Sequence, residues 1–317
     1  MSCQNCGAAE LELLFTAPAF DAPFTESRIE RCRNCSLVNT ETVSPDELAR
    51  AYSVDYYGSP EQKFNPALET IIGWLHRRQA KKLLGIWSRG ETSTAAPRVM
   101  DIGCGRGLLL SAFQKMGAEV HGLERPEFEI APAMRNVVKT GAITDAAYID
   151  QHFDVVVLWH VLEHLHNTLE HMQHLGEHLR EGGVLVLSVP NFDSFQRRLF
   201  RRSWFHLDVP RHLLHIETNW LLSTLKQQGY TIEAVQHFDF TQNIFGFVQS
   251  AMNVVAPQHA NEFYRLLKQG RRGNLLRLFG WGATSLLLLP MAVLESIYSV
   301  AVKQGATVTV VARKEKQ

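Results

Sequence analysis

The stretch from Arg98 to Gly107 constrains the fold more than any other part of the sequence. It reads Arg-Val-Met-Asp-Ile-Gly-Cys-Gly-Arg-Gly, a short β-favouring apolar run that leads into glycines at alternate positions. Helical periodicity follows from Leu108 to Met116. A strand, a tight glycine turn and a helix N-terminus make a cradle for a nucleotide, because glycine adopts unusual dihedral angles and lets a ligand touch the backbone.

The spacing of the glycines separates two kinds of nucleotide site. A dinucleotide-binding turn has the form Gly-x-Gly-x-x-Gly, whereas here Gly107 comes one residue early and Leu108 takes its place. The form Asp-x-Gly-x-Gly-x-Gly resembles motif I of class I S-adenosylmethionine-dependent methyltransferases. That resemblance implies that Asp101 faces the methionine end of the cofactor and that Gly103, Gly105 and Gly107 make room for its adenosine. On the glycines alone, a glycine-rich turn in another α/β protein is the alternative.

Strands and helices alternate from Arg98 onward, as in a doubly wound sheet. Strands are predicted at 98–102, 119–124, 136–139, 153–159, 184–191, 230–238 and 306–313, and helices at 66–87, 108–116, about 160–179 and 218–228. The last two strands form an antiparallel hairpin in this fold, so residues 241–304 are an insertion far longer than a hairpin loop. We therefore predict an α/β fold, a Rossmann-like doubly wound seven-stranded sheet with an antiparallel last strand.

Three further positions point to the cofactor. Glu124 closes the second strand about twenty residues after the glycine turn, where a carboxylate can accept hydrogen bonds from both ribose hydroxyls. The run from Phe153 to Asn191 resembles post-motif I through motif III of the same methyltransferases. The resemblance implies a side chain near the adenine amine at about Asp145, and we also assign Trp159, at the end of the fourth strand, to the cofactor site.

Four of the five cysteines predict a metal site near the N-terminus. Cys3-x-x-Cys6 and Cys32-x-x-Cys35 each supply two thiolates, which together complete a tetrahedral shell for a structural Zn²⁺. Four reduced cysteines without a metal are the alternative. We predict a zinc-ribbon-like segment over 1–45, a helical linker or cap over 46–95 and a methyltransferase domain over 96–317. The methyltransferases that the chain resembles in carrying such a segment act on small molecules, including sugars and quinone precursors.

Histidines near the fourth and fifth strands are candidates for proton transfer. Methyl transfer from a sulfonium requires alignment of donor and acceptor and removal of a proton, which suits histidine. We predict His164 or His212 as the general base, with His160 as a third candidate. On a helix, His160, Glu163 and His164 share one face. Some quinone-ring O-methyltransferases have Glu-x-x-Glu-His here and hold a divalent ion, so Glu163 and His164 can alternatively bind such an ion, although His160 replaces the first acid.

The stretch 203–215 holds three histidines, an acid and a tryptophan without helical or strand alternation. It follows the fifth strand, on the side where ligands bind in open α/β sheets. We predict that Trp204, His206, Asp208 and His215 line the pocket for a small-molecule acceptor. For each histidine taken singly, the alternative is a structural residue with satisfied hydrogen bonds.

The insertion contains an uncharged apolar run from residue 278 to residue 294. A bilayer span requires about twenty apolar residues, and this run is shorter and is interrupted by two glycines and a proline. Spanning would also separate the sixth strand from the seventh. We rank burial against the domain first and a peripheral membrane contact through 275–302 second, supported by Arg271, Arg272 and Arg277. A homodimer interface is the other alternative.

Charge and composition narrow the function. The chain has 32 basic and 32 acidic residues, so no overall field attracts nucleic acid, and we expect no nucleic-acid partner. The start lacks the features of a signal peptide, which predicts a cytoplasmic protein, with membrane association through the apolar run as an addition. We predict an S-adenosylmethionine-dependent methyltransferase acting on a sugar, a lipid-linked sugar or a quinone-type acceptor. The alternatives are an inactive methyltransferase-like binding scaffold and a protein or nucleic-acid methyltransferase guided by the zinc ribbon.

Overall fold

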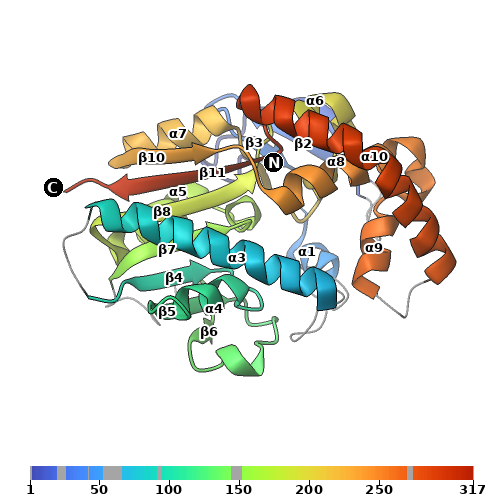
Figure 1. Ribbon diagram of the computed structural model, residues 1–317. Coiled ribbons are helices and arrows are strands. Elements are labelled where there is room, and N and C mark those ends of the chain that lie inside the picture. The colour runs from blue at the N-terminus through green and yellow to red at the C-terminus, as the bar shows by residue number, and fades with distance from the viewer. Residues whose placement is uncertain are drawn as a thin grey trace.

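The computed structural model describes residues 2–19, 26–41, 43–52, 66–90, 95–143, 152–269 and 274–316. Within them, one mixed sheet has the order β10-β11-β8-β7-β4-β5-β6 (Figure 1). Its strands are β4 (Arg98–Ile102), β5 (Glu119–Glu124), β6 (Val138–Thr140), β7 (Phe153–Trp159), β8 (Leu179–Pro190), β10 (Tyr230–Gln236) and β11 (Thr307–Lys314). Strands β4 to β8 are parallel, and β11 is antiparallel to both neighbours. The predicted seven-stranded sheet is therefore confirmed.

Helices cover both faces of this sheet. They are α3 (Pro66–Trp87), α4 (Leu108–Gln114), α5 (Thr168–His178) and α7 (Thr218–Gln227). Successive residues of a strand point to opposite faces, so Val155 and Val157 of β7 pack in the cluster with α3 and α4. Val156 and Leu158 pack in the cluster with α5 and α7. Helix α3, which the sequence places in a linker, is thus part of the core.

Two predicted boundaries around β7 and β8 are wrong. We expected one helix from about residue 160, but His160 has a φ of 56°, and only a short 3₁₀ turn, Leu162–His164, follows before α5. We also expected the next strand to begin at residue 184. Instead α5 ends at His178, Leu179 is extended, and the pair Gly182–Gly183 forms an irregular stretch inside β8, where the register with β7 shifts. The left-handed residue and the early extended backbone interrupt a run whose apolar spacing alone favours a helix.

A second, four-stranded sheet joins the N-terminal segment to the rest of the molecule. Its order is β1 (Leu11–Pro18), β2 (Glu26–Cys32), β3 (Val38–Thr40) and β9 (Leu214–His215). The fourth strand comes from the stretch predicted to bind substrate. Beneath the sheet, Ile29 and Val38 share one apolar cluster with Phe192 and Trp204. The segment is therefore packed into the methyltransferase-like domain.

The insertion between β10 and β11 consists of α8 (Phe240–Val255), α9 (Glu262–Gln269) and α10 (Leu275–Ala301), with a 3₁₀ turn after α8. Helix α10 is continuous through both glycines and Pro290. Our ranking of burial first for this run is wrong, because many of its large apolar side chains are exposed, including Phe279 at 81% and Leu287 at 79%. Apolar composition alone does not identify which neighbour covers a helix.

Candidate active site and cysteine cluster

The glycine turn after β4 adopts the strained backbone that its sequence predicts. Gly103, Gly105 and Gly107 have φ values of 66°, 53° and 72°, in the left-handed region that glycine tolerates best. A Cβ on Gly103 would lie 2.4 Å from Cγ2 of Val161, so the segment after β7 rests directly on this turn. A Cβ on Gly105 would meet nothing within 4 Å, which leaves that side of the turn open for a ligand.

Two acids lie beside the turn. Asp101 in β4 is buried, and burial, with the charge of Glu124, raises its pKa well above the usual range. Glu124, at the end of β5, accepts hydrogen bonds from the backbone N–H of Gly105 (2.6 Å) and of Arg125 (2.9 Å). Burial nevertheless raises the pKa of Glu124 as well. Both carboxyl groups are therefore buried in surroundings of low polarity. There, a cation or hydroxyl groups of a ligand would be favourable partners.

Three predicted catalytic or ion-binding residues converge next to this turn. Glu163, His164 and His212 each bring one donor atom to within 4.8 Å of the others. His160 joins the group, since its Nδ1 lies 3.2 Å from Oε1 of Glu163. In the described part of the chain, Oε2 of Glu163 and Nε2 of His160 are buried without a hydrogen-bond partner. These two atoms of the cluster are therefore available to contact a ligand or an ion.

The hydrogen bonds of the two histidines fix which nitrogen carries the proton. Nδ1 of His164 is 2.9 Å from the carbonyl oxygen of Arg211, and Nδ1 of His212 is 2.9 Å from that of His206. A carbonyl only accepts, so each Nδ1 is the protonated donor and each Nε2 carries a free lone pair. Both rings can thus accept a proton or ligate an ion through Nε2.

Burial sets the charges of this cluster. Burial, aided by the neighbouring His212, lowers the pKa of His164 to about 4, so that this ring is neutral at pH 7. Burial would raise the pKa of Glu163, but its hydrogen bond with His160 and the surrounding imidazoles lower it to about 2. Asp208 stays ionised because the Arg211 guanidinium outweighs its burial and holds its pKa far below the usual range. The site therefore presents a carboxylate beside neutral imidazole at neutral pH.

Comparison with known proteins identifies this site. A profile of the family described as "Methyltransferase domain" matches residues 72–235, from α3 to β10. The chain belongs to this methyltransferase family. A ubiquinone biosynthesis O-methyltransferase of Cereibacter sphaeroides (strain ATCC 17025 / ATH 2.4.3) is 27% identical over 194 residues, 54% of this chain and 75% of the relative. That of Ruegeria sp. (strain TM1040) is 31% identical over 164 residues, 47% and 65% of the two chains.

A solved S-adenosylmethionine-dependent methyltransferase from Archaeoglobus fulgidus covers 76% of this chain and 94% of its own, with a TM-score of 0.46 and 15% identity. The predicted activity, S-adenosylmethionine-dependent methyl transfer, is confirmed by the family. The residues at the glycine turn fit this cofactor. Asp101 is a buried acid to which no described residue donates a hydrogen bond. Apart from Gly105 and its two chain neighbours, no described residue has an atom within 4 Å of a Cβ built on Gly105.

One side chain that contacts the histidine cluster is not among the predicted site residues. Tyr52 follows α1 (Pro45–Ala51), and its hydroxyl lies 2.9 Å from Nδ1 of His164. The Arg125 guanidinium lies 3.9 Å from the centre of the Tyr52 ring. Tyr52 thus links the residue after Glu124 to the histidine cluster and covers the space between them. Tyr56 and Tyr57, which are close to Tyr52 in sequence, lie outside the described residues.

The predicted substrate residues have mixed surroundings. Trp204 is 1% exposed in the core shared with the N-terminal sheet. His215 bonds Thr40 Oγ1 at 2.9 Å, and His206 bonds the Gln242 carbonyl at 3.1 Å, so packing and hydrogen bonding already employ these side chains. Asp208 alone of the four lies at the cluster, 3.8 Å from Nε2 of His212.

Trp159 and Asp145 are the remaining predicted cofactor residues, and only Trp159 is among the described residues. Trp159 is half-buried at the end of β7, and its ring centre lies 6.4 Å from that of His160. Asp145 lies outside the described residues, as does the rest of 144–151. Their roles stay predictions.

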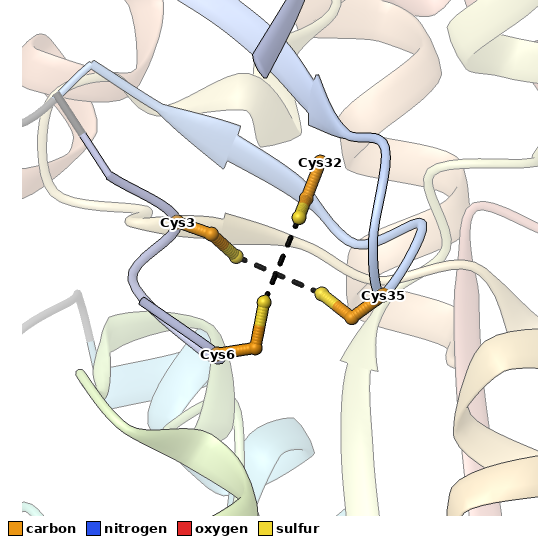
Figure 2. A group of neighbouring side chains, drawn as sticks. All are labelled: Cys3, Cys6, Cys32 and Cys35. Carbon is orange, nitrogen blue, oxygen red and sulfur yellow. Dashed lines mark hydrogen bonds between the residues drawn. The ribbon is translucent and has the colours of Figure 1, made fainter. Parts of the chain in front are cut away.

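The four N-terminal cysteines point at one another from two turns (Figure 2). Sγ of Cys3 lies 3.6 Å from that of Cys35, and Sγ of Cys6 lies 3.6 Å from that of Cys32. A tetrahedral zinc with bonds of about 2.3 Å separates its sulfurs by about 3.8 Å, so the cluster fits the ion. The side-chain amides of Asn5 and Asn34 donate to Cys35 and Cys6, as outer residues of thiolate sites do.

Proposed function

We propose that this methyltransferase transfers the methyl group to a hydroxyl oxygen of a small-molecule acceptor, first of all a quinone precursor. The observation that carries the proposal is the cluster of Glu163, His164 and His212, which rests against the glycine turn through Val161. The relatives are named ubiquinone biosynthesis O-methyltransferases. Those names support oxygen as the methylated atom and a quinone precursor as the acceptor. Sugars and lipid-linked sugars are the second choice.

When bound, S-adenosylmethionine supplies a methyl group on a positively charged sulfur. Asp101 and Glu124 would hold its methionine end and its ribose, and the open side of Gly105 would receive its adenosine. Transfer of that methyl group to a hydroxyl oxygen would release the hydroxyl proton, which a group of the protein would have to accept. Alignment at the Val161 contact and a base within hydrogen-bond reach are therefore the main contributions of the protein.

We assign the proton to His212 in preference to His164. The free Nε2 of His212 lies 3.8 Å from Oδ2 of Asp208, which would stabilise the protonated ring. For His164, burial outweighs the nearby charges of Glu163 and Asp208 and lowers the pKa to about 4. His164 would then orient the acceptor through its own Nε2, while Tyr52 fixes the opposite side of its ring.

Steady-state kinetics test this assignment. S-adenosylhomocysteine release is measured with 3,4-dihydroxybenzoic acid as a catechol probe and UDP-glucose as a sugar probe. For His212→Gln, kcat with the probe that accepts the methyl group should fall by about 100-fold or more. The affinity for S-adenosylhomocysteine should stay within about threefold of the wild-type value. His174→Gln, on α5, is the matched control. Near-normal turnover of both His212→Gln and His164→Gln would rule out both of these histidines as the base.

A divalent ion held by Glu163, His164 and His212 is a second role for the same cluster. Two imidazole nitrogens and one carboxylate form a donor set that binds many divalent ions, and the unpartnered Oε2 of Glu163 favours this role. A hydroxyl proton would then leave more easily from an acceptor bound to the ion. Brief chelation followed by added Mg²⁺ distinguishes an ion site from a histidine base that works without an ion. Turnover that is lost on chelation and recovers with Mg²⁺ supports the ion site. Unchanged turnover supports the base alone.

We further propose that the cysteine cluster holds a structural Zn²⁺. All four ligand positions of the metal would be filled by Cys3, Cys6, Cys32 and Cys35, which leaves no place for a substrate. Native mass spectrometry of the purified protein should give a mass increase of one zinc, which Cys6→Ser removes and Cys104→Ser keeps. A metal-free wild-type protein that remains folded would contradict the proposal.

A further inference from the structure

Helix α10 has one face that packs on the protein and one that does not. The inward face places Ala292, Ser296 and Ser299 against the rest of the molecule. Glu295 also points inward, and its Oε2 accepts a hydrogen bond of 2.8 Å from Gln196 of α6 (Phe195–Phe200). The partly buried Leu278, Trp281 and Leu288 pack against a cluster formed by α8 and α9. This side therefore fixes α10 along the edge of the molecule (Figure 1).

The outer face of α10 is a continuous apolar row. We define it by side chains that are between 64% and 85% exposed: Leu276, Phe279, Leu286, Leu287, Leu294 and Ile297. Their separations of three, seven, eight and eleven residues place them on one side of the helix. From Leu276 to Ile297 the row has a length of about 32 Å at about 1.5 Å per residue. Single exposed leucines are ordinary, but a row of this length marks an interaction surface.

Charged groups border the outer face and do not interrupt it. Arg277 and Glu295 are the charged residues of α10. The first pairs with Glu262 of α9, and the second points inward. Basic residues lie at both ends in sequence, Arg271 and Arg272 before the helix and Lys303 after it.

More arginines lie on α6, which packs on α10, and just after it. Helix α6 contacts α10 through Gln196 and through the rings of Phe195 and Tyr298, whose centres are 5.2 Å apart. The same segment carries Arg198 and continues into the exposed Arg201 and Arg202. An apolar face bordered by arginine and lysine is the pattern of helices that lie in the plane of a membrane surface.

We propose that the outer face of α10 docks on the surface of a membrane that contains anionic lipids. The row of apolar side chains would enter the boundary between headgroups and acyl chains, and the bordering arginines would meet lipid phosphates. The helix is long and apolar enough to span a bilayer by length and composition. A span would, however, bring Glu295 and Ser296 into lipid and separate α10 from α8, so the helix lies on the membrane.

A second copy of the chain fits this face less well than a membrane does. Two copies that met through α10 would bring their bordering arginines together, and like charges at an interface weaken it. Anionic headgroups instead complement those charges. The proposal does not depend on the acceptor, because it rests on the exposure and charge pattern of α10 alone.

Vesicle co-sedimentation of the full chain tests the proposal. Vesicles of phosphatidylcholine with about one quarter phosphatidylglycerol are compared with phosphatidylcholine alone. We expect the wild-type protein to sediment with the anionic vesicles, at least about tenfold less with the neutral ones, and less when salt at about 0.5 M screens the charges. The double variant Phe279→Glu/Leu287→Glu should bind at least about tenfold more weakly, because it places charge in the acyl boundary. Leu13→Glu, on β1 and 48% exposed, is the matched control and should bind as the wild type does.

Three outcomes would overturn the proposal. The first is a wild-type protein that stays in solution with both vesicles, and the second is a double variant that binds as tightly as the wild type. The third is a dimer in sedimentation velocity that the double variant dissociates, since the face would then bind a second copy. Protein that resists release by alkaline carbonate would indicate a span and would also contradict surface docking. Unchanged binding of S-adenosylhomocysteine shows that the double variant is folded.

Discussion

Gly103 illustrates how one backbone position sets the active site. Its φ is left-handed, and a Cβ at this position would approach Val161 to 2.4 Å, so only glycine fits. Because Val161 lies between His160 and Glu163, this contact fixes the histidine cluster relative to the glycine turn. The spacing between the glycine turn and the histidine cluster is therefore set by Gly103 and Val161.

Replacement of Gly103 by alanine should cost more stability than an equally strained glycine elsewhere. Gly117 has a φ of 88° with nothing within 4 Å of its Cβ position, so Gly117→Ala should cost about 1–2 kcal/mol from backbone strain alone. Gly103→Ala adds a clash with Val161 and should cost at least about 1 kcal/mol more. Urea unfolding measures both. Equal midpoints for the two variants would show that the loop after β7 gives way freely.

His215 should make stability depend on pH. Burial, with His212 nearby, lowers its pKa to about 3. A folded-state pKa below that of the unfolded chain, about 6.5, means that the unfolded chain binds the proton first, so stability is lost as pH falls below about 6.5. Between pH 7 and pH 5 the wild type should lose about 2 kcal/mol more than His215→Gln, which does not titrate.

The measurement for His215 is the difference between two pH series of urea unfolding. Other groups cancel in that difference, including Asp101, whose raised pKa acts in the opposite direction. Parallel stability curves for the two proteins would contradict the assignment of His215 as a buried neutral ring.

At the scale of elements, the pairing of β3 with β9 joins the cysteine cluster to the active site. Val38 and Asn39 pair with His215 and Leu214, and the hydroxyl of Thr40 donates to the carbonyl of His212 at 2.6 Å. β3 begins shortly after Cys35, so the cluster fixes the strand that holds the proposed base. The N-terminal segment thus has a route to influence catalysis without touching substrate.

Loss of the cysteine cluster should therefore loosen residues 212–215. In hydrogen-exchange mass spectrometry, Cys6→Ser should raise exchange in a peptide that covers them by about tenfold or more, whereas β7 keeps its protection. Cys104→Ser, beside the glycine turn, serves as the control for a lost thiol. Unchanged exchange at 212–215 would mean that β9 holds its place without the cluster.

At the scale of the whole molecule, the N-terminal segment and the methyltransferase sheet share one core. Ile29 and Val38 on one side pack with Phe192 and Trp204 on the other. The sequence predicts separate units over 1–45, 46–95 and 96–317, and these boundaries stay predictions. The shared cluster and the place of α3 in the main core indicate that the units are not stable alone.

A chain that starts at residue 44 should lose cooperative folding. Removal of β1, β2 and β3 uncovers Phe192, Trp204, Leu207 and Val209. At about 1.5–3 kcal/mol for each large apolar side chain, the loss is roughly 6–12 kcal/mol, as large as the stability of a typical domain. Thermal unfolding by circular dichroism and binding of a hydrophobic dye measure the effect. A sharp transition at the wild-type midpoint would establish residues 44–317 as an independent domain.

The sequence alone determined the features that depend on neighbours along the chain. Continuous apolar runs specify β4, β7 and β11, because a strand buried on both faces needs no alternation. The alternate glycines specify the turn at 103–107, since few other residues adopt its dihedral angles. The two Cys-x-x-Cys pairs can likewise be recognised by their spacing along the chain. The main sheet, the cofactor turn and the cysteine cluster could all be predicted for this reason.

Only the tertiary structure decided which distant residues meet. His212 reaches Glu163 and His164 from far along the chain because β9 pairs with β3 and lies beside the turn after β7. Trp204 and His215 were predicted by type, but a neighbouring sheet surrounds them, and no local pattern records that sheet. Helix α10 is the converse, since its apolar residues predicted burial while no described element covers its outer face. Residue type fixes what a side chain can do, and the packing of separate elements fixes what it contacts.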